Sequence, residues 1–207
     1  MIDFKVNKHE IVCLTNQDKY KAVYIYNLER EKLAQTFNFR NQKLLNVYGL
    51  RSVAVSAGSR FMLLAGWTKK EEGAKEYPFV SFFSKEVNDG RSEYVLKGTT
   101  VLSNMSTTIT ALEFMPKKQN NFIFFMAIDF DGNLGIYRTD QIRFEQVFFK
   151  ERFHEGKIEA TLFTFCQFFE FLLIFVGRVN CLDFDYNMRL ITCSDDCSIK
   201  SAVFYPN

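Results

Sequence analysis

The sequence predicts an all-β fold made of about four four-stranded antiparallel units, the last of them incomplete. Short runs rich in β-branched and aromatic residues alternate with turn-forming residues along the chain. The pattern is clearest near the C-terminus, in the runs Val179–Phe184, Leu190–Cys193 and Ile199–Phe204. The same plan recurs three times upstream, so we expect one repeated unit and not a mixture of elements.

The composition is that of a globular chain. Its 207 residues are 47% hydrophobic and include only three prolines, which is enough apolar material for a sizeable core. The formal net charge is +2, and positive and negative residues are mixed along the length. This balance does not favour binding to nucleic acid or to an anionic membrane surface.

Cysteine usage indicates a reducing, intracellular compartment, either cytoplasmic or nuclear. The five cysteines form an odd set without a C-x-x-C pair. One strongly apolar run, Phe163–Val176, is shorter than the roughly 20 residues that a membrane span needs, and it contains Gln167 and Glu170. We therefore expect no membrane span.

Units one and two each contain four predicted strands. Unit one covers about residues 1–48, with strands at Ile2–Val6, Glu10–Asn16, Ala22–Asn27 and Lys32–Phe39. Unit two covers about residues 49–100, with strands at Ser52–Ser56, Phe61–Gly66, Phe79–Ser84 and Glu93–Lys97. The middle strands of unit two are separated by a longer polar loop, Thr68–Tyr77.

Units three and four continue the plan. Unit three covers about residues 101–153, with strands at Ile109–Phe114, Phe122–Ile128, Leu134–Tyr137 and Phe144–Phe149. Its middle turn, Asp129–Asn133, has the Asp-Gly chemistry of a tight hairpin. Unit four covers about residues 178–207 and stops after its third strand.

The spacing of the third strands tests this repeat. Aligning them places Tyr26, Phe83, Tyr137 and Ala202 at equivalent positions, with separations of 57, 54 and 65 residues. The excess in the last interval lies in Lys157–Gly177.

Two interpretations of this segment, residues 157–177, remain open. Codons for Gly-Lys at its start and Val-Gly at its end can spell splice-site signals, and removing its 21 residues shortens the interval from 65 to 44. The segment is then a translated intron. Alternatively, it is a real insertion at a unit junction, either a short buried helix or a hydrophobic partner-binding loop.

Unit four also resembles the WD-repeat (transducin beta-like) family. The resemblance rests on His154-Glu155-Gly156, on the strand Val-Asn-Cys-Leu-Asp-Phe, and on Leu-Ile-Thr-Cys-Ser-Asp-Asp-Cys-Ser-Ile-Lys, in which Asp196 occupies the family's turn position. It implies a β-propeller with four antiparallel strands in each blade. The chain departs from the family at the end of the third strand, where the family has tryptophan and this chain has Tyr26, Phe83, Tyr137 and Ala202.

Burial gives a physical reason for such a stack. A sheet with two apolar faces, such as the one predicted around Phe122–Ile128, cannot cover both by itself, whereas similar sheets stacked around an axis cover one another. Fewer than four complete blades is below the usual range. The chain is therefore expected to be a segment of a larger propeller.

Candidate chemistry is sparse, and we expect no catalytic residue, no cofactor and no metal. The run from Asp129 to Asp140 resembles a calcium loop, but Leu134 replaces the glycine of its sharp turn and strands flank it, so a hairpin turn containing Asp131 is favoured. Cys181, Cys193 and Cys197 are better explained as small strand residues than as zinc ligands with His154.

The other candidate residues are better explained by structural or binding contacts than by catalysis. Ser194 lies in no nucleophile-elbow motif, so turn capping explains it better. The single tryptophan, Trp67, begins the long loop of unit two, and with Lys69 and Lys70 it is a candidate partner-binding site. We expect His154 and Asp196 to hold structural turns.

The predicted function is a non-catalytic scaffold. The WD-repeat resemblance implies a rigid disc whose loops and rims bind other proteins within a multisubunit complex, with no small-molecule substrate. The alternative is an RNA-associated or membrane-traffic propeller subunit.

Overall fold

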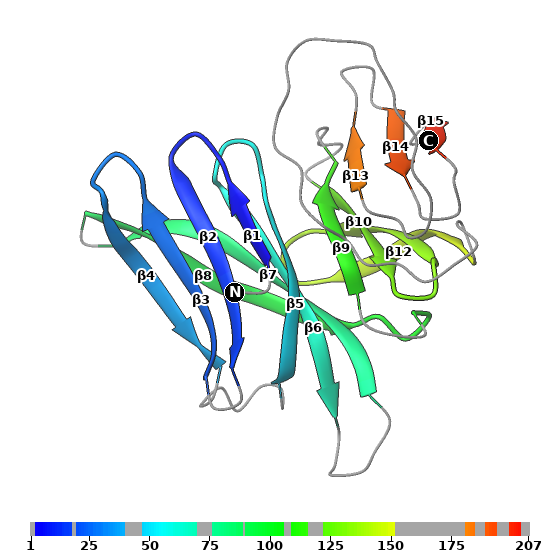
Figure 1. Cartoon of the computed structure of the whole chain (residues 1–207), viewed down its shortest axis with the longest axis horizontal. Helices are drawn as coiled ribbons and strands as arrows, with labels where there is room; N and C mark the ends of the chain where they lie inside the picture. The colour runs from blue at the N-terminus through cyan, green and yellow to red at the C-terminus, as the bar shows by residue number, and fades with distance from the viewer. Residues whose placement is uncertain are drawn as a thin grey trace.

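The all-β prediction is confirmed for the part of the chain that the computed structural model describes. This part comprises residues 3–17, 20–39, 47–69, 76–88, 90–105, 109–115, 122–151, 181–184, 189–193 and 199–203. It contains 15 β-strands and no α-helix. The strands form three four-stranded sheets and one three-stranded sheet (Figure 1).

Each sheet is an antiparallel meander in which neighbouring strands follow one another in sequence. Sheet 1 contains β1 (Asp3–Val6), β2 (Glu10–Gln17), β3 (Tyr20–Asn27) and β4 (Lys32–Asn38). Sheet 2 contains β5 (Val47–Val55), β6 (Phe61–Lys69), β7 (Glu76–Asn88) and β8 (Arg91–Val101). Sheet 3 contains β9 (Ile109–Phe114), β10 (Ile123–Asp129), β11 (Leu134–Thr139) and β12 (Phe144–Lys150). Sheet 4 contains β13 (Cys181–Phe184), β14 (Arg189–Cys193) and β15 (Ile199–Val203).

The strands of sheet 2 are longer than the sequence predicted. The β6–β7 hairpin continues through the pairs Thr68↔Tyr77 and Lys69↔Glu76, so both ends of the predicted loop Thr68–Tyr77 belong to strands. The prediction followed the apolar run and ended the strand at Gly66, although burial continues as far as Thr68 at 6% exposure. Antiparallel backbone pairing does not depend on an apolar side-chain pattern, and it extends the hairpin beyond the apolar run.

One irregularity recurs at the same place in all three four-stranded sheets. The pairing of the third strand with the fourth shifts between Ile25 and Tyr26, between Phe82 and Phe83, and between Ile136 and Tyr137. Each shift is a β-bulge that adds a residue to the outer strand and strengthens its twist. The bulges show that Tyr26, Phe83 and Tyr137 are structurally equivalent, which is the register that the third-strand alignment predicted.

The sheets pack face to face, and sheet 2 lies between sheets 1 and 3. Strand β7 shows why: its alternating side chains serve two cores, since Phe79 and Phe83 face sheet 1 whereas Val80 and Phe82 face sheet 3. All four side chains are fully buried. A strand buried on both faces is apolar at successive positions, which explains the continuous apolar run in this part of the sequence.

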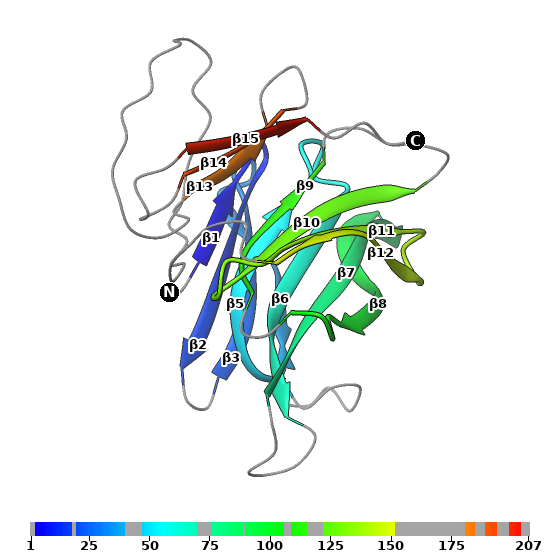
Figure 2. The same ribbon diagram turned by 90° about the vertical axis from the view of Figure 1, so that its right-hand side faces the viewer.

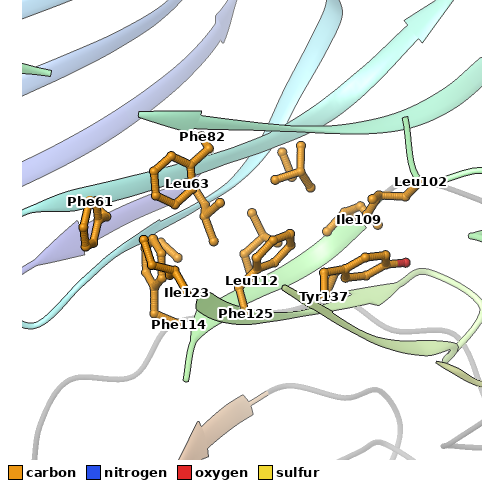
Figure 3. Close-up of a cluster of buried hydrophobic side chains, with 14 of the residues drawn as sticks. Phe61, Leu63, Phe82, Leu102, Ile109, Leu112, Phe114, Ile123, Phe125 and Tyr137 are labelled. Atoms are coloured by element: carbon orange, nitrogen blue, oxygen red, sulfur yellow. The ribbon is translucent and has the colours of Figure 1, made fainter. Parts of the chain in front are cut away.

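The two cores differ in their aromatic contacts. Between sheets 1 and 2, the rings of Phe37 and Phe83 lie 5.1 Å apart between centroids. Between sheets 2 and 3, Phe82 meets Phe114 edge to face with centroids 6.3 Å apart (Figure 3). Edge-to-face and tilted pairs of this kind add to the stabilisation that comes from burial alone.

The first strands of successive sheets are neighbours. Strand β1 contacts β5, β5 contacts β9, and β9 contacts β13, which sets the sheets in an arc with β4, β8 and β12 on its outer side (Figures 1 and 2). Polar side chains join these inner strands. Asp3 accepts a hydrogen bond from the Val53 backbone N–H at 2.9 Å, and Lys5 forms an ion pair with Glu113 at 3.0 Å.

Candidate protein-interaction site

Trp67 is a strand residue, which corrects its predicted position at the start of a loop. It lies in β6, opposite Pro78 of β7 and Gly49 of β5. Its partly buried indole ring lies directly on Gly49, where a β-carbon would overlap the ring. Gly66, next to it in β6, passes so close to the Gly49 carbonyl oxygen that a β-carbon would overlap that atom as well. Gly49 thus leaves the space that the indole ring occupies, and Gly66 leaves the space that the Gly49 carbonyl occupies.

The remaining predicted site residues are only partly covered by the structure. Lys69 is the last residue of β6 and pairs with Glu76 across the hairpin. Lys70, His154 and Asp196 lie outside the described residues, as does the segment Lys157–Gly177. Their proposed roles in binding and in turns therefore stay predictions.

The turn between β10 and β11 is organised by Asp129, whereas the sequence predicted Asp131 as the structural turn residue and gave Asp129 only as the first position of a calcium-loop pattern. Its fully buried carboxylate accepts three hydrogen bonds: from the backbone N–H groups of Asp131 (3.0 Å) and Asn133 (2.9 Å), and from the Asn133 side-chain amide (2.8 Å). Asp131 is exposed and contributes its backbone N–H. Gly132 takes a positive φ of 87°, a conformation that glycine adopts without a steric penalty.

This geometry explains the calcium-loop pattern without a cation. The Asp129 carboxylate is surrounded by N–H donors, which supply the positive partial charge that a metal ion would otherwise provide. In the described residues no group of three or more His, Cys, Asp or Glu side chains is arranged to hold a metal ion.

A second buried polar cluster joins sheets 1 and 2. Glu10 of β2 forms an ion pair with Lys85 of β7, with 6% and 18% of their side chains exposed. The Tyr94 hydroxyl of β8 lies 3.1 Å from the second Glu10 carboxylate oxygen and 2.9 Å from the Ser59 carbonyl oxygen. The Lys85 ammonium also lies over the Tyr94 ring, 4.7 Å from its centroid.

The same tyrosine is fixed through its backbone. Tyr94 N–H donates to the side-chain carbonyl of Gln35 at 2.8 Å, and the Gln35 amide donates back to the Tyr94 carbonyl at 2.9 Å. Gln35 thereby adds strand-like pairing between β4 and β8, the outer strands of two different sheets. Burial, followed by the Glu10 charge and hydrogen bond, raises the pKa of Tyr94 far above its usual range, so the hydroxyl keeps its proton as a donor.

The three equivalent positions marked by the bulges differ sharply in exposure. Phe83 is 0% exposed and Tyr137 is 3% exposed, because each faces the preceding sheet. Burial, with the nearby Asp129 charge as a smaller cause, raises the pKa of Tyr137 well above its ordinary value. Tyr26 is 36% exposed, because no described sheet precedes sheet 1. Sheet 1 therefore carries a face that its counterparts bury.

This face is absent from the sequence-based candidates, although a signal for it was present. Tyr24 and Tyr26 alternate with Val23 and Ile25 in β3, which is the pattern of a strand with two apolar faces. Sequence alone could not show which of the two faces a neighbouring sheet covers.

The fold of this chain is assigned from the strand order and register described above, because the structural similarity found by comparison with known proteins is weak. No protein-family model and no curated protein matches the chain. A solved structure of U3-55K is similar with a TM-score of 0.39 and 10% identity, over 93% of this chain. The chain spans 57% of the length of that structure. In the described residues, no helix has the length and apolar character of a membrane span.

Proposed function

We propose that this chain is a segment of a WD-repeat-like β-propeller that acts as a non-catalytic platform for binding other proteins within a multisubunit complex. One observation carries the proposal: three meander sheets with the same bulge position pack face to face along an arc. A repeated stack of this kind is a rigid body whose hairpins and outer strands are presented at its rims, which suits recognition of other proteins.

The buried polar contacts among the described residues support a structural role for these groups. The Glu10–Lys85–Tyr94 cluster links two sheets, and the Asp129 carboxylate holds a hairpin. Buried polar groups that satisfy one another in this way hold neighbouring elements in one arrangement. We assign these groups to positioning of the sheets and propose no small-molecule substrate, cofactor or metal. The mixed charge and the cysteine usage support action on proteins inside the cell.

The β6–β7 hairpin is the first rim site to test. Trp67 is partly exposed above Gly49, and Lys69, the last residue of β6, is followed in the sequence by Lys70. Tryptophan is enriched among the residues that dominate binding energy at protein interfaces, so a partly exposed Trp67 on a strand is a candidate anchor.

The experiment is affinity purification of the tagged full chain from its own cells, followed by quantitative mass spectrometry. We expect a defined set of proteins that persists after nuclease treatment, and a loss of part of that set in a Lys69→Glu/Lys70→Glu variant. A matched Lys32→Glu variant changes an exposed lysine in β4 of sheet 1 and should keep the set.

Two results would contradict the platform. Retention of RNA that falls steeply with salt, with proteins lost on nuclease treatment, would favour the RNA-associated alternative. Turnover of a small molecule by the purified chain would favour an enzyme.

A further inference from the structure

Two cysteines occupy directly opposite positions in sheet 4. Strands β13 and β14 are antiparallel, and their register pairs Cys181 with Cys193. Cys181 is the first residue of β13, and Cys193 is the last residue of β14. The same register continues without a shift to the pair Phe184↔Leu190, so all four pairs of the two strands agree on it.

This register meets the main distance requirement of a disulfide. Opposite residues in an antiparallel pair have α-carbons about 4.5 Å or about 5.5 Å apart, depending on the kind of pair. Disulfides usually span about 4.4–6.8 Å between α-carbons, so either kind of pair qualifies. The β-carbons at such positions generally lie about 4.5–5.5 Å apart and must approach by about an ångström, which favours a bond that is readily reduced. A bond between Cys181 and Cys193 therefore needs no slip of one strand along the other.

Cys13 provides a comparison within the same chain. It lies in β2, where the register places Phe4 on one side of it and Tyr24 on the other. Neither of these strand neighbours carries a thiol. Burial also raises the pKa of the Cys13 thiol, which lowers the fraction present as the reactive thiolate. Cys13 is therefore a matched control for the opposed pair.

We propose that Cys181 and Cys193 form a reversible disulfide in response to hydrogen peroxide, and that this bond locks β13 onto β14. The sequence predicts a reducing compartment, where disulfides are usually transient and respond to oxidants. The pair belongs to a different sheet from the β6–β7 hairpin, and its oxidation needs no bound partner. Its test is therefore independent of the platform function.

The peroxide supplies the oxidant for this step. One thiolate attacks a peroxide oxygen, the O–O bond breaks, and a sulfenic acid and one water form. The opposite thiolate attacks the sulfenic sulfur, the S–O bond breaks, and the departing hydroxide takes a proton to form a second water. The two thiols lose two electrons and two protons in total. A dithiol such as dithiothreitol reverses the reaction by thiol–disulfide exchange.

The bond acts on two short strands. β13 has four residues and β14 has five, so few backbone hydrogen bonds hold them together. A covalent link between them restricts the separated state of the hairpin. β13 also contacts β9 of sheet 3, so the link steadies the strand at this junction.

The test is disulfide mapping of the full chain, alkylated before and after treatment with hydrogen peroxide. Trypsin cleaves after Arg189 and so puts Cys181 and Cys193 on separate peptides. We expect peroxide to join these peptides, with the loss of two hydrogen atoms in mass, and dithiothreitol to separate them. In its own cells the pair should be reduced before exposure to peroxide and linked after it.

Matched variants locate the bond. Cys13→Ser should leave the linkage unchanged, and Cys181→Ser or Cys193→Ser should abolish it. Cys197 shares a tryptic peptide with Cys193, so Cys197→Ser is a second control and should keep the linkage. Hydrogen–deuterium exchange of the oxidised wild type should slow about tenfold or more in β13 and β14 and stay unchanged in β2.

Four outcomes would overturn the proposal. A bridge from either cysteine to Cys197, or no joined peptide after peroxide, would show that the register does not bring the two thiols together. A linkage already complete in untreated cells would show a permanent bond, and unchanged exchange in both strands would show that the bond locks nothing. Mapping of the wild type needs no substitution, so it decides the linkage even where a serine variant fails to fold.

Discussion

The hydroxyl of Tyr94 lies 3.1 Å from a carboxylate oxygen of Glu10, and this contact joins the outer strand of sheet 2 to the second strand of sheet 1. Both residues are buried, with Tyr94 at 2% and Glu10 at 5% exposure. The contact is polar, yet it lies beside the apolar core that Val12, Leu14 and Met62 help to form. It therefore fixes how two apolar faces, which could slide on one another, are aligned.

Replacing Tyr94 by phenylalanine should lower the free energy of unfolding by about 1–2 kcal/mol. The ring stays, but Glu10 and the Ser59 carbonyl lose the single O–H donor that lies within hydrogen-bond distance of both. Urea denaturation of the full chain measures the effect. Tyr24→Phe is the control because its side chain is 37% exposed, and its midpoint should stay unchanged. Equal midpoints for the two variants would contradict the role of the hydroxyl.

Replacing Asp129 by alanine should cost about 2–3 kcal/mol, since three hydrogen bonds to a buried carboxylate are lost together. Asp131→Ala removes a neighbouring carboxylate that is exposed, and it should change stability by less than about 0.5 kcal/mol. Thermal melts of both variants decide between the two aspartates. A larger loss of stability in Asp131→Ala than in Asp129→Ala would show that Asp131, as the sequence predicted, organises the turn.

Gly49→Ala should destabilise the protein by about 1–3 kcal/mol and change the emission of the single tryptophan, because the new methyl group must displace the Trp67 ring. Gly58→Ala is the matched control, since its β-carbon would meet no atom within 4 Å. Fluorescence spectra and urea midpoints report both effects. An unchanged emission spectrum in Gly49→Ala would show that the ring does not rest on this glycine.

Asp140 should make a pH-dependent contribution to stability. Backbone N–H bonds from Arg143 (2.7 Å) and Ile142 (3.0 Å) lower the pKa of this carboxyl below its ordinary 3.8. A lowered folded-state pKa adds stability above the unfolded value, and this stability is lost as the pH falls through the folded value. The wild type should therefore melt higher than Asp140→Asn at about pH 6, and the gap should close below about pH 4. A gap that is constant with pH would contradict the charge-assisted bonds.

Local sequence patterns predicted much of the architecture. Alternating apolar residues and turn residues located the strands, and the spacing of third strands identified Tyr26, Phe83 and Tyr137 as equivalent, which the bulges confirm. The Asp-Gly pair located the β10–β11 hairpin. These features depend on residues close together in sequence, where backbone geometry and side-chain period leave few choices.

Contacts between sheets were decided by the tertiary structure. Glu10 and Tyr94 are 84 residues apart, so no local pattern pairs them. Asp129 and Asp131 look alike in sequence, and only burial shows which carboxylate organises the turn. Tyr26 and Phe83 likewise share a position in the repeat, but Phe83 is buried and Tyr26 is partly exposed. Strand pattern determines that a face is apolar, whereas the presence of a neighbouring sheet determines whether that face belongs to the core or to the surface.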